Sequence, residues 1–542
     1  MKRMTFISDS FTRVFQSHKV VLIFLFIIFV VTEIIINPIG NFPLNDDWVY
    51  GKVLDTLINH HFIDTRIWGG ASMLTHIFYG KLWTGIFGFS YTVLRFSTLF
   101  IAFFGIVFFY FLLSDFVVIQ KQQALIGTLM VCFNPLFLSL ANSYMTDVPF
   151  VCFVIIGLYF YLKYVEKNNL LFLIISIVIF LWIICTRQLS LAMVFGIYLI
   201  RVWQTKRTFG SHGILFIISI IGLFLFEYWL RHQKQSYISA GYSYLFFNAG
   251  DTGNASYWVE FFSNFSKRWI HFLIFSGFAL FPFLMVYLYD FVRRDINKKN
   301  VLILSIPFFV AVLIAIRKFP LGNYLYNTGF GPDLLFNTAR DSSTIEFAFI
   351  KALSILGSIT LVFIGINAII KHKMKLFVVV KKETLSGSII ISFIFYYIFI
   401  CFSNALFDRY FLIITILTVP VLLKVFPAIF NYKILFGICF TFQMLYSVLS
   451  TKDYLQANRI KWEAVDYAKT VLKVHDTDIN TGYEFDDFNR GVVNMKLDRW
   501  FNEPPNKIII SHQKIPGYRV AKEFYFQRFL PVKTDTVFVL EK

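Results

Sequence analysis

The chain has 542 residues, of which 57% are hydrophobic and only 15% are charged, and its mean hydropathy is +0.66. In soluble domains about a quarter of the residues are charged. This composition therefore excludes an ordinary soluble protein and indicates that a lipid bilayer surrounds most of the chain. The formal net charge of +18 is spread between hydrophobic runs. These basic residues therefore indicate how the chain is oriented across the membrane, and they do not indicate a nucleic-acid-binding surface.

The first hydrophobic run covers residues 20–36 and has no small-residue cleavage site after it, so we expect a retained helix and not a cleaved signal peptide. A bilayer crossing takes about 20 apolar residues. Candidate spans begin near residues 20, 92, 123, 147, 169, 189, 213, 269, 300, 347, 387, 410 and 432. The sequence therefore predicts an all-α polytopic membrane protein with about thirteen transmembrane helices, all within residues 1–450.

Lysines and arginines concentrate in alternate connections between these spans, for example at residues 293–299, whereas the long connections 39–90, 231–268 and 317–346 alternate with them. Since basic connections stay in the cytoplasm, we expect a cytoplasmic N-terminus in a multi-pass protein of the plasma (inner) membrane. The odd number of spans then places residues 451–542 outside.

The external segment, residues 451–542, differs in character from the rest of the chain. Residues 458–474 alternate apolar and polar positions at helical spacing, and short β-like runs follow at 507–510, 519–521 and 536–540. This pattern predicts a small C-terminal α/β domain at the external membrane face.

The first external loop, residues 39–90, begins with the acidic pair Asp46 and Asp47 where the chain leaves the bilayer. Two amphipathic stretches follow, at residues 50–62 and 73–82, with apolar side chains recurring every three or four positions. Helices of this kind lie in the plane of the membrane interface. We expect them to form a shelf at the outer surface.

Asp46, Asp47 and Asp147 lie at the outer ends of apolar segments, where a carboxylate is costly and is by default a functional candidate. Such a group, held near hydrocarbon and near a second carboxylate, has a raised pKa and suits a general base. The alternative is helix capping, with Asn45 or Asp46 before one helix and Thr146 or Asp147 before another. The sequence leaves both interpretations open, and they are compatible.

Three basic residues, Lys81, Arg187 and Arg409, lie close to the same outer face. One interpretation is that their long side chains reach from the hydrocarbon layer to water. The other is that they bind a phosphate, to which arginine can donate two parallel hydrogen bonds. His60, His61 and His76 lack the spacing of metal ligands. We therefore predict no metal-ligating residues.

The order of these motifs resembles the GT-C glycosyltransferases, in particular the family 39-like and lipid A aminoarabinose transferase-like branch. The matching features are the acidic pair of the first loop with its interfacial helices, residues 87–95, Thr146-Asp147-Val148-Pro149, residues 320–332, and Phe407-Asp408-Arg409-Tyr410. The resemblance covers most of residues 1–450 and implies a GT-C-like fold. It implies a catalytic role for Asp46 or Asp47 and matches Asp147 to the acidic residue of the second loop.

One departure concerns the donor phosphate. Many relatives carry a Lys-Pro-Pro run in the first external loop, and this chain has Trp68-Gly69-Gly70-Ala71 instead. Lys81 or Arg66 would have to take over that contact, with Arg187 and Arg409 as the other candidates for phosphate binding.

The resemblance implies transfer of a sugar from a polyprenyl-phosphate donor to a lipid, glycan or protein acceptor of the cell envelope. The reaction would invert the anomeric centre and use an Asp general base. No cofactor is certain, and a divalent cation remains an open requirement. A transporter or flippase for a lipid-linked saccharide is the alternative, although no internal repeat supports it. A non-catalytic scaffold or receptor is a third class, which leaves the acidic loop without a purpose.

Overall fold

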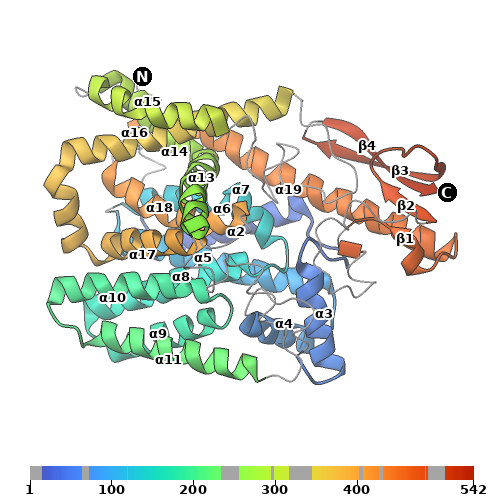
Figure 1. Ribbon diagram of the computed structural model, residues 1–542, viewed down its shortest axis with the longest axis horizontal. Coiled ribbons are helices and arrows are strands. Elements are labelled where there is room, and N and C mark those ends of the chain that lie inside the picture. Colours follow the sequence, from blue (N-terminus) through green and yellow to red (C-terminus); the bar gives the residue numbers. More distant parts are fainter. Residues whose placement is uncertain are drawn as a thin grey trace.

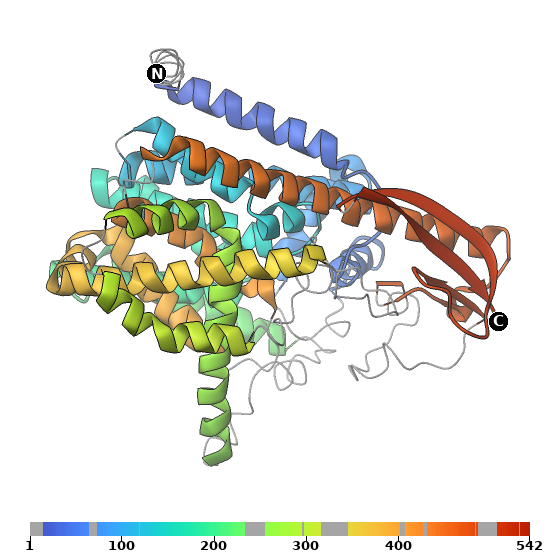
Figure 2. The same cartoon turned by 90° about the horizontal axis from the view of Figure 1, so that it is seen from above.

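The structure is a computed structural model that describes residues 15–63, 73–118, 120–232, 255–294, 298–315, 345–401, 407–426, 431–482, 484–485, 507–530 and 532–542. Helices form a large bundle, and a small β-sheet lies beyond one end of it, on the right in Figure 1. In Figure 2 the sheet lies at the right, and the first described helix, drawn in blue, begins on the side of the bundle away from it.

Each predicted span start falls in or within two residues of a helix. The bundle helices are α2 (His18–Ile36), α5 (Tyr91–Phe116), α6 (Lys121–Cys132), α7 (Pro135–Ala141), α8 (Asp147–Lys167), α9 (Leu170–Ile184), α10 (Leu191–Thr205), α11 (Ser211–Arg231), α13 (Ala255–Ala279), α14 (Phe281–Arg294), α15 (Lys298–Ala315), α16 (Ile345–Lys382), α17 (Thr384–Cys401), α18 (Leu412–Val425) and α19 (Lys433–Thr470). The prediction of a polytopic helical protein is therefore confirmed.

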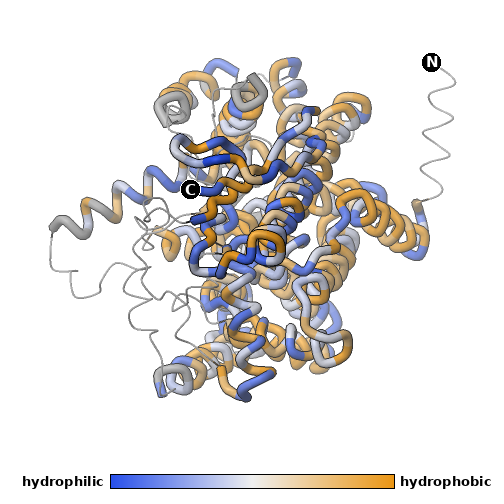
Figure 3. Tube along the Cα trace, turned by 90° about the vertical axis from the view of Figure 1, so that its right-hand side faces the viewer, coloured by the Kyte–Doolittle hydropathy of each residue, from blue (hydrophilic) through white to orange (hydrophobic). Residues whose placement is uncertain are grey.

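Within the described residues, seven helices are long and apolar enough to cross a bilayer. The number rises to nine if the pairs α6–α7 and α13–α14, bent by 64° and 91°, each count as one span. The chain is a multi-pass membrane protein, while the higher number of about thirteen spans stays a prediction. Figure 3 shows hydrophobic colour along most helices, including the one that follows the N-terminus.

The first loop contains the two predicted interfacial helices. They are α3 (Asp47–Asn59) and α4 (Leu74–Phe87). Val53 and Leu54 on the apolar side of α3 are fully buried, whereas Asn59 at its end is exposed. Nε2 of His76 on α4 donates a hydrogen bond at 3.1 Å to the backbone oxygen of Tyr144, which joins this loop to the connection between α7 and α8.

The C-terminal part contains the predicted sheet and extends it. Its strands are β1 (Ile479–Asn480), β2 (Ile508–Ser511), β3 (Arg519–Phe529) and β4 (Val532–Glu541), in the order β1-β2-β4-β3. β1 pairs with β2 in parallel, and the other neighbours are antiparallel. The sequence did not predict β1, because a strand of two residues is too short to show an alternation of apolar and polar side chains.

Helix α19 connects the bundle to this sheet without interruption (Figure 1). Its 38 residues span about 57 Å at 1.5 Å per residue. The domain boundary that we placed between residues 450 and 451 therefore falls inside one continuous helix. The far half of α19 packs Ala464 and Val465 against Ile508 and Val539 of the sheet, so the two parts share a rigid element.

Candidate active site

Asp46 and Arg409 form a buried ion pair. Asp46 precedes α3, and Arg409 lies on a short 3-10 helix, η4 (Asp408–Phe411), just before α18. The Nη2 of Arg409 donates to Oδ2 of Asp46 at 2.8 Å, and Oδ1 of Asp408 accepts the backbone N–H of Arg409 at 2.8 Å. The Asp46 side chain makes no capping hydrogen bond. The capping interpretation is therefore wrong for Asp46, whose carboxylate serves the ion pair instead.

Asp147 and Arg187 form a second pair. Asp147 opens α8, and Arg187 precedes the 3-10 turn η1 (Gln188–Ser190). Nη2 of Arg187 lies 2.9 Å from Oδ1 of Asp147, and the Nε and Nη2 groups donate to Oγ1 of Thr146 at 3.0 and 2.9 Å. Thr146 is the N-cap residue of α8 but makes no side-chain cap bond. Its hydroxyl orients the guanidinium.

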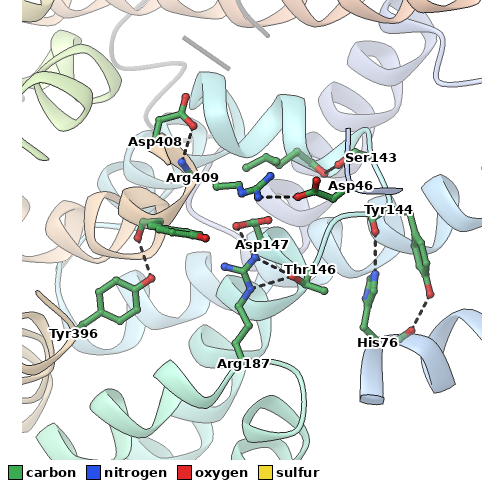
Figure 4. Close-up of polar contacts among 12 residues, drawn as sticks. Asp46, His76, Ser143, Tyr144, Thr146, Asp147, Arg187, Tyr396, Asp408 and Arg409 are labelled. Atoms are coloured by element: carbon green, nitrogen blue, oxygen red, sulfur yellow. Dashed lines mark hydrogen bonds and ion pairs between the residues drawn. The ribbon is translucent and has the colours of Figure 1, made fainter. Parts of the chain in front are cut away.

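The two pairs belong to one cluster, as Figure 4 shows. The phenol groups of Tyr50 and Tyr410 each interact electrostatically with Asp46, Asp147, Arg187 and Arg409. Burial raises the pKa of Tyr410, so its hydroxyl stays neutral near these charges. The four residues come from four distant segments, and their formal charges cancel. A buried cluster of this kind is stable only while every charge keeps a partner.

Asp47 has a different environment from its neighbour Asp46. It is 1% exposed. Burial raises its pKa to about 7, and the nearby backbone of Tyr144 and the charge of Arg95 oppose this rise only in part. Arg95 itself donates to the carbonyl groups of Pro38, Gly40 and Phe42. Asp47 is therefore buried near Arg95, while Asp46 takes part in the ion-pair cluster.

The remaining predicted residues do not join this cluster in the described structure. Lys81 is exposed on α4 and takes part in neither ion pair. Arg66 and the stretch Trp68-Gly69-Gly70-Ala71 lie outside the described residues, as does the motif at 320–332. His76 stacks on Tyr144 at 4.1 Å, and burial lowers its pKa to about 4. Among the described residues, no group of three or more His, Cys, Asp or Glu is arranged to hold a metal ion.

An apolar pocket of about 150 Å³ adjoins the cluster. It lies between α8, α10, α17 and α18 and is lined by Phe150, Val154, Leu189, Ser190, Ala192, Met193, Ile389, Ile390, Ser392, Phe393, Tyr396, Ile413, Ile414, Leu417, Thr418 and Val421. The N–H of Ser190 donates to the carbonyl of Arg187 at 3.1 Å, and the hydroxyl of Tyr396 donates to the carbonyl of Tyr410 at 2.9 Å. The pocket thus ends at the two turns that carry the arginines. It extends about 12 Å along α18.

Three residues of the site were missed or misread in the sequence. Asp408 was seen only as part of a motif, although an acidic residue at the start of a span was the signal that singled out Asp147. Thr146 was considered as a cap and as part of a motif, but not as a partner of Arg187. Tyr396 lies in a continuous apolar run, and nothing in the sequence marks it.

A protein-family model matches part of this chain. A family model described as dolichyl-phosphate-mannose-protein mannosyltransferase matches residues 75–230, which include Asp147 and Arg187. The match confirms the resemblance to the GT-C membrane glycosyltransferases that the motifs predicted, in the part of the chain it covers. No match was found among the curated proteins.

Solved structures show weaker likeness. ArnT from Cupriavidus metallidurans bound to undecaprenyl phosphate aligns with 95% of this chain and 97% of its own length, at 10% identity and a TM-score of 0.39. AglB from Archaeoglobus fulgidus, in complex with an inhibitory peptide and a dolichol-phosphate, aligns with 83% of this chain and 58% of its own, at 12% identity and a TM-score of 0.44. Likeness at this level carries no argument about activity.

Proposed function

We propose that the protein transfers a sugar from a polyprenyl-phosphate donor to a lipid, glycan or protein acceptor of the cell envelope, with inversion at the anomeric carbon. One observation carries the proposal: two buried Asp–Arg pairs lie at the end of an apolar pocket between α8, α10, α17 and α18. A lipid-linked phosphate needs both an apolar channel for its chain and cations for its head. This arrangement supplies both beside two carboxylates.

The arginines are suited to the phosphate of the donor. Guanidinium groups bind phosphate oxygens through two parallel hydrogen bonds, and preorganised cations stabilise the charge that develops on a departing phosphate. Thr146 and Asp147 already orient Arg187, while Asp408 fixes the backbone of Arg409. Since a lipid phosphate is a good leaving group, the chemistry requires no strong general acid.

Asp46 is the better candidate for the base. Its side chain is 11% exposed, compared with 1% for that of Asp147, and Asp47 as a whole residue is also only 1% exposed. A donor phosphate that engages Arg409 competes with Asp46 for the guanidinium and leaves the carboxylate available. The acceptor oxygen then attacks the anomeric carbon, the bond from that carbon to the phosphate oxygen breaks, and Asp46 takes the hydroxyl proton. Polyprenyl phosphate leaves with the bonding electrons.

The surroundings of the cluster agree with an enzyme at a membrane surface. Asp147, Leu191 and Leu412 begin α8, α10 and α18, and Asp46 precedes α3, so the cluster lies where helices end rather than at their middle. A transporter of lipid-linked saccharides would need such charges near the bilayer centre. We assign this end to the external face of the plasma (inner) membrane and the N-terminus to the cytoplasm. Because Arg409 and Arg187 already pair with Asp46 and Asp147, the proposed mechanism uses no divalent cation.

The test is turnover by the purified full-length protein with a panel of polyprenyl-phosphate-linked sugars, measured as release of polyprenyl phosphate. We expect Asp46→Asn/Asp47→Asn to lower turnover by about 100-fold or more, since removal of a general base costs at least that. Lys81→Gln is the matched control and should retain near-normal turnover. Near-normal turnover of the double variant would remove the assignment of the site.

A further inference from the structure

The loop between α2 and α3 contains Asp46, and three ionic side chains from distant segments hold its backbone. Nη2 of Arg459 on α19 donates to the carbonyl groups of Asn37 and Ile39 at 3.1 and 2.8 Å. Arg95 holds the middle of the loop through the carbonyl groups described above. Glu484, which follows β1, accepts the N–H of Asn45 at 3.4 Å. The loop is thus held at its start, middle and end.

Glu484 is itself held by a buried charge. Its second carboxylate oxygen accepts a hydrogen bond from Nζ of Lys461 at 2.8 Å, and the two side chains are 2% and 1% exposed. Lys461 lies on the outer half of α19, three residues before Ala464, which packs against the sheet. The rings of Trp462 and Phe485 pack edge to face with their centroids 5.7 Å apart, and this contact holds the same segment. The C-terminal domain therefore reaches the backbone of the acidic loop through one carboxylate.

We propose that Glu484, held in place by Lys461, is a positioning residue that sets the place of Asp46 through the backbone of Asn45. The C-terminal domain then acts as part of the active site without contacting the substrate. This inference rests on the proposed function, because it gives a role to a contact one residue away from the proposed base.

The backbone at Asn45 makes this contact consequential. Asn45 has a φ of 52°, in the left-handed region, so the chain turns sharply there before α3 begins. A small rotation at this residue moves the Asp46 carboxylate relative to Arg409. A misplacement of about 1 Å in a catalytic group can cost about 100-fold in rate. The alternative is that the Lys461–Glu484 pair only stabilises the domain.

Two double variants separate these roles. Lys461→Met/Glu484→Leu removes the ion pair and the acceptor for Asn45, whereas Lys461→Met/Glu484→Gln removes the ion pair but keeps an amide oxygen as acceptor. Both replace a buried ion pair without leaving one charge unpaired, a change that is often tolerated. The two variants differ in the amide group at residue 484, whose oxygen can accept the N–H of Asn45 and whose NH2 group faces the methionine side chain that replaces Lys461.

The first readout is hydrogen exchange of peptides that cover residues 41–48 of the full-length protein, which needs no substrate. We expect exchange at Asn45 to rise about 5-fold in the Met/Leu variant and to stay within about 2-fold of wild type in the Met/Gln variant. With a donor that supports turnover, kcat of the Met/Leu variant should fall about 10-fold at nearly constant KM, with Met/Gln largely rescued.

Equal exchange at Asn45 in the two variants overturns the proposal, as does equal turnover when exchange differs. A failure of the proposed function looks different. In that case wild-type protein turns over no lipid-linked donor, or Asp46→Asn retains full activity. Neither of these results depends on Glu484.

Discussion

Nη2 of Arg409 and Oδ2 of Asp46 are joined by a hydrogen bond of 2.8 Å across 363 positions of the sequence. The bond brings the first loop against the turn before α18. It also keeps the Asp46 carboxylate away from the capping role that its place before α3 would suggest. A charged bond between buried groups is strong but depends on both partners. The behaviour of either residue should therefore change when the other is altered.

The first prediction concerns Arg409 as a phosphate ligand. Arg409→Lys keeps the charge and loses the planar pair of donors, so we expect affinity for polyprenyl phosphate to fall about 10-fold, with a larger fall for Arg409→Gln. Binding is measured by thermal shift of the purified protein with polyprenyl phosphate. Lys81→Gln, an exposed lysine outside the cluster, is the control. Equal losses for Lys81→Gln and Arg409→Gln would contradict a specific phosphate site.

The helices were predictable because each follows from a local apolar run, and the interfacial helices α3 and α4 follow from local periodicity. The candidates Asp46, Asp147, Arg187 and Arg409 were found from charge at span ends. Their pairing was not, because a local sequence pattern cannot show which arginine meets which carboxylate. Glu484 carried no signal at all. It stands between Tyr483 and Phe485 in the sequence, and only the fold brings it to Asn45 and Lys461.

The second prediction concerns pH and Asp47. Burial raises the pKa of Asp47 from 3.8 to about 7, so between these values the folded protein holds a proton that the unfolded chain has released. The stabilising contribution of protonated Asp47 is complete below about pH 4 and disappears as the pH rises through about 7. The shift of about three units corresponds to at most about 4 kcal/mol.

Asp47→Asn removes this dependence. We expect the variant to gain apparent melting temperature over wild type, with a larger gain at pH 8 than at pH 5. Thermal unfolding of both proteins in the same detergent at the two pH values is the measurement. Asp55→Asn on the same helix is the control and should show no such trend. An equal difference at both pH values would mean that Asp47 does not hold a proton in the folded state.

The third prediction follows from the left-handed backbone at Asn45, where φ is 52°. Glycine adopts this conformation freely, whereas alanine in it costs roughly 1–2 kcal/mol per residue. We therefore expect Asn45→Gly to retain more stability and turnover than Asn45→Ala, although alanine is the smaller chemical change. Apparent melting temperature and donor turnover are compared for the two variants. The reverse order would show that the side chain of Asn45, and not its backbone, supports the loop.

The fourth prediction tests the apolar pocket as the site of the lipid chain. Ile390 on α17 lines the pocket, and Ile394, one turn further along the same helix, is 48% exposed at the surface. Ile390→Trp adds a large side chain to a confined space, so it should exclude part of the chain and lower affinity for long-chain polyprenyl phosphate by about 10-fold. Ile394→Trp makes the same substitution facing outward and should leave affinity unchanged.

A short-chain isoprenyl phosphate sharpens this comparison. Its head still meets Arg187 and Arg409, but its tail ends before the deeper lining at Thr418 and Val421. Ile390→Trp should therefore weaken the long-chain ligand more than the short-chain one, with thermal shift as the common measurement. If both ligands weaken equally, the substitution has disturbed the cluster itself. If neither weakens, the lipid chain lies elsewhere, and the two Asp–Arg pairs would have to receive their phosphate from another direction.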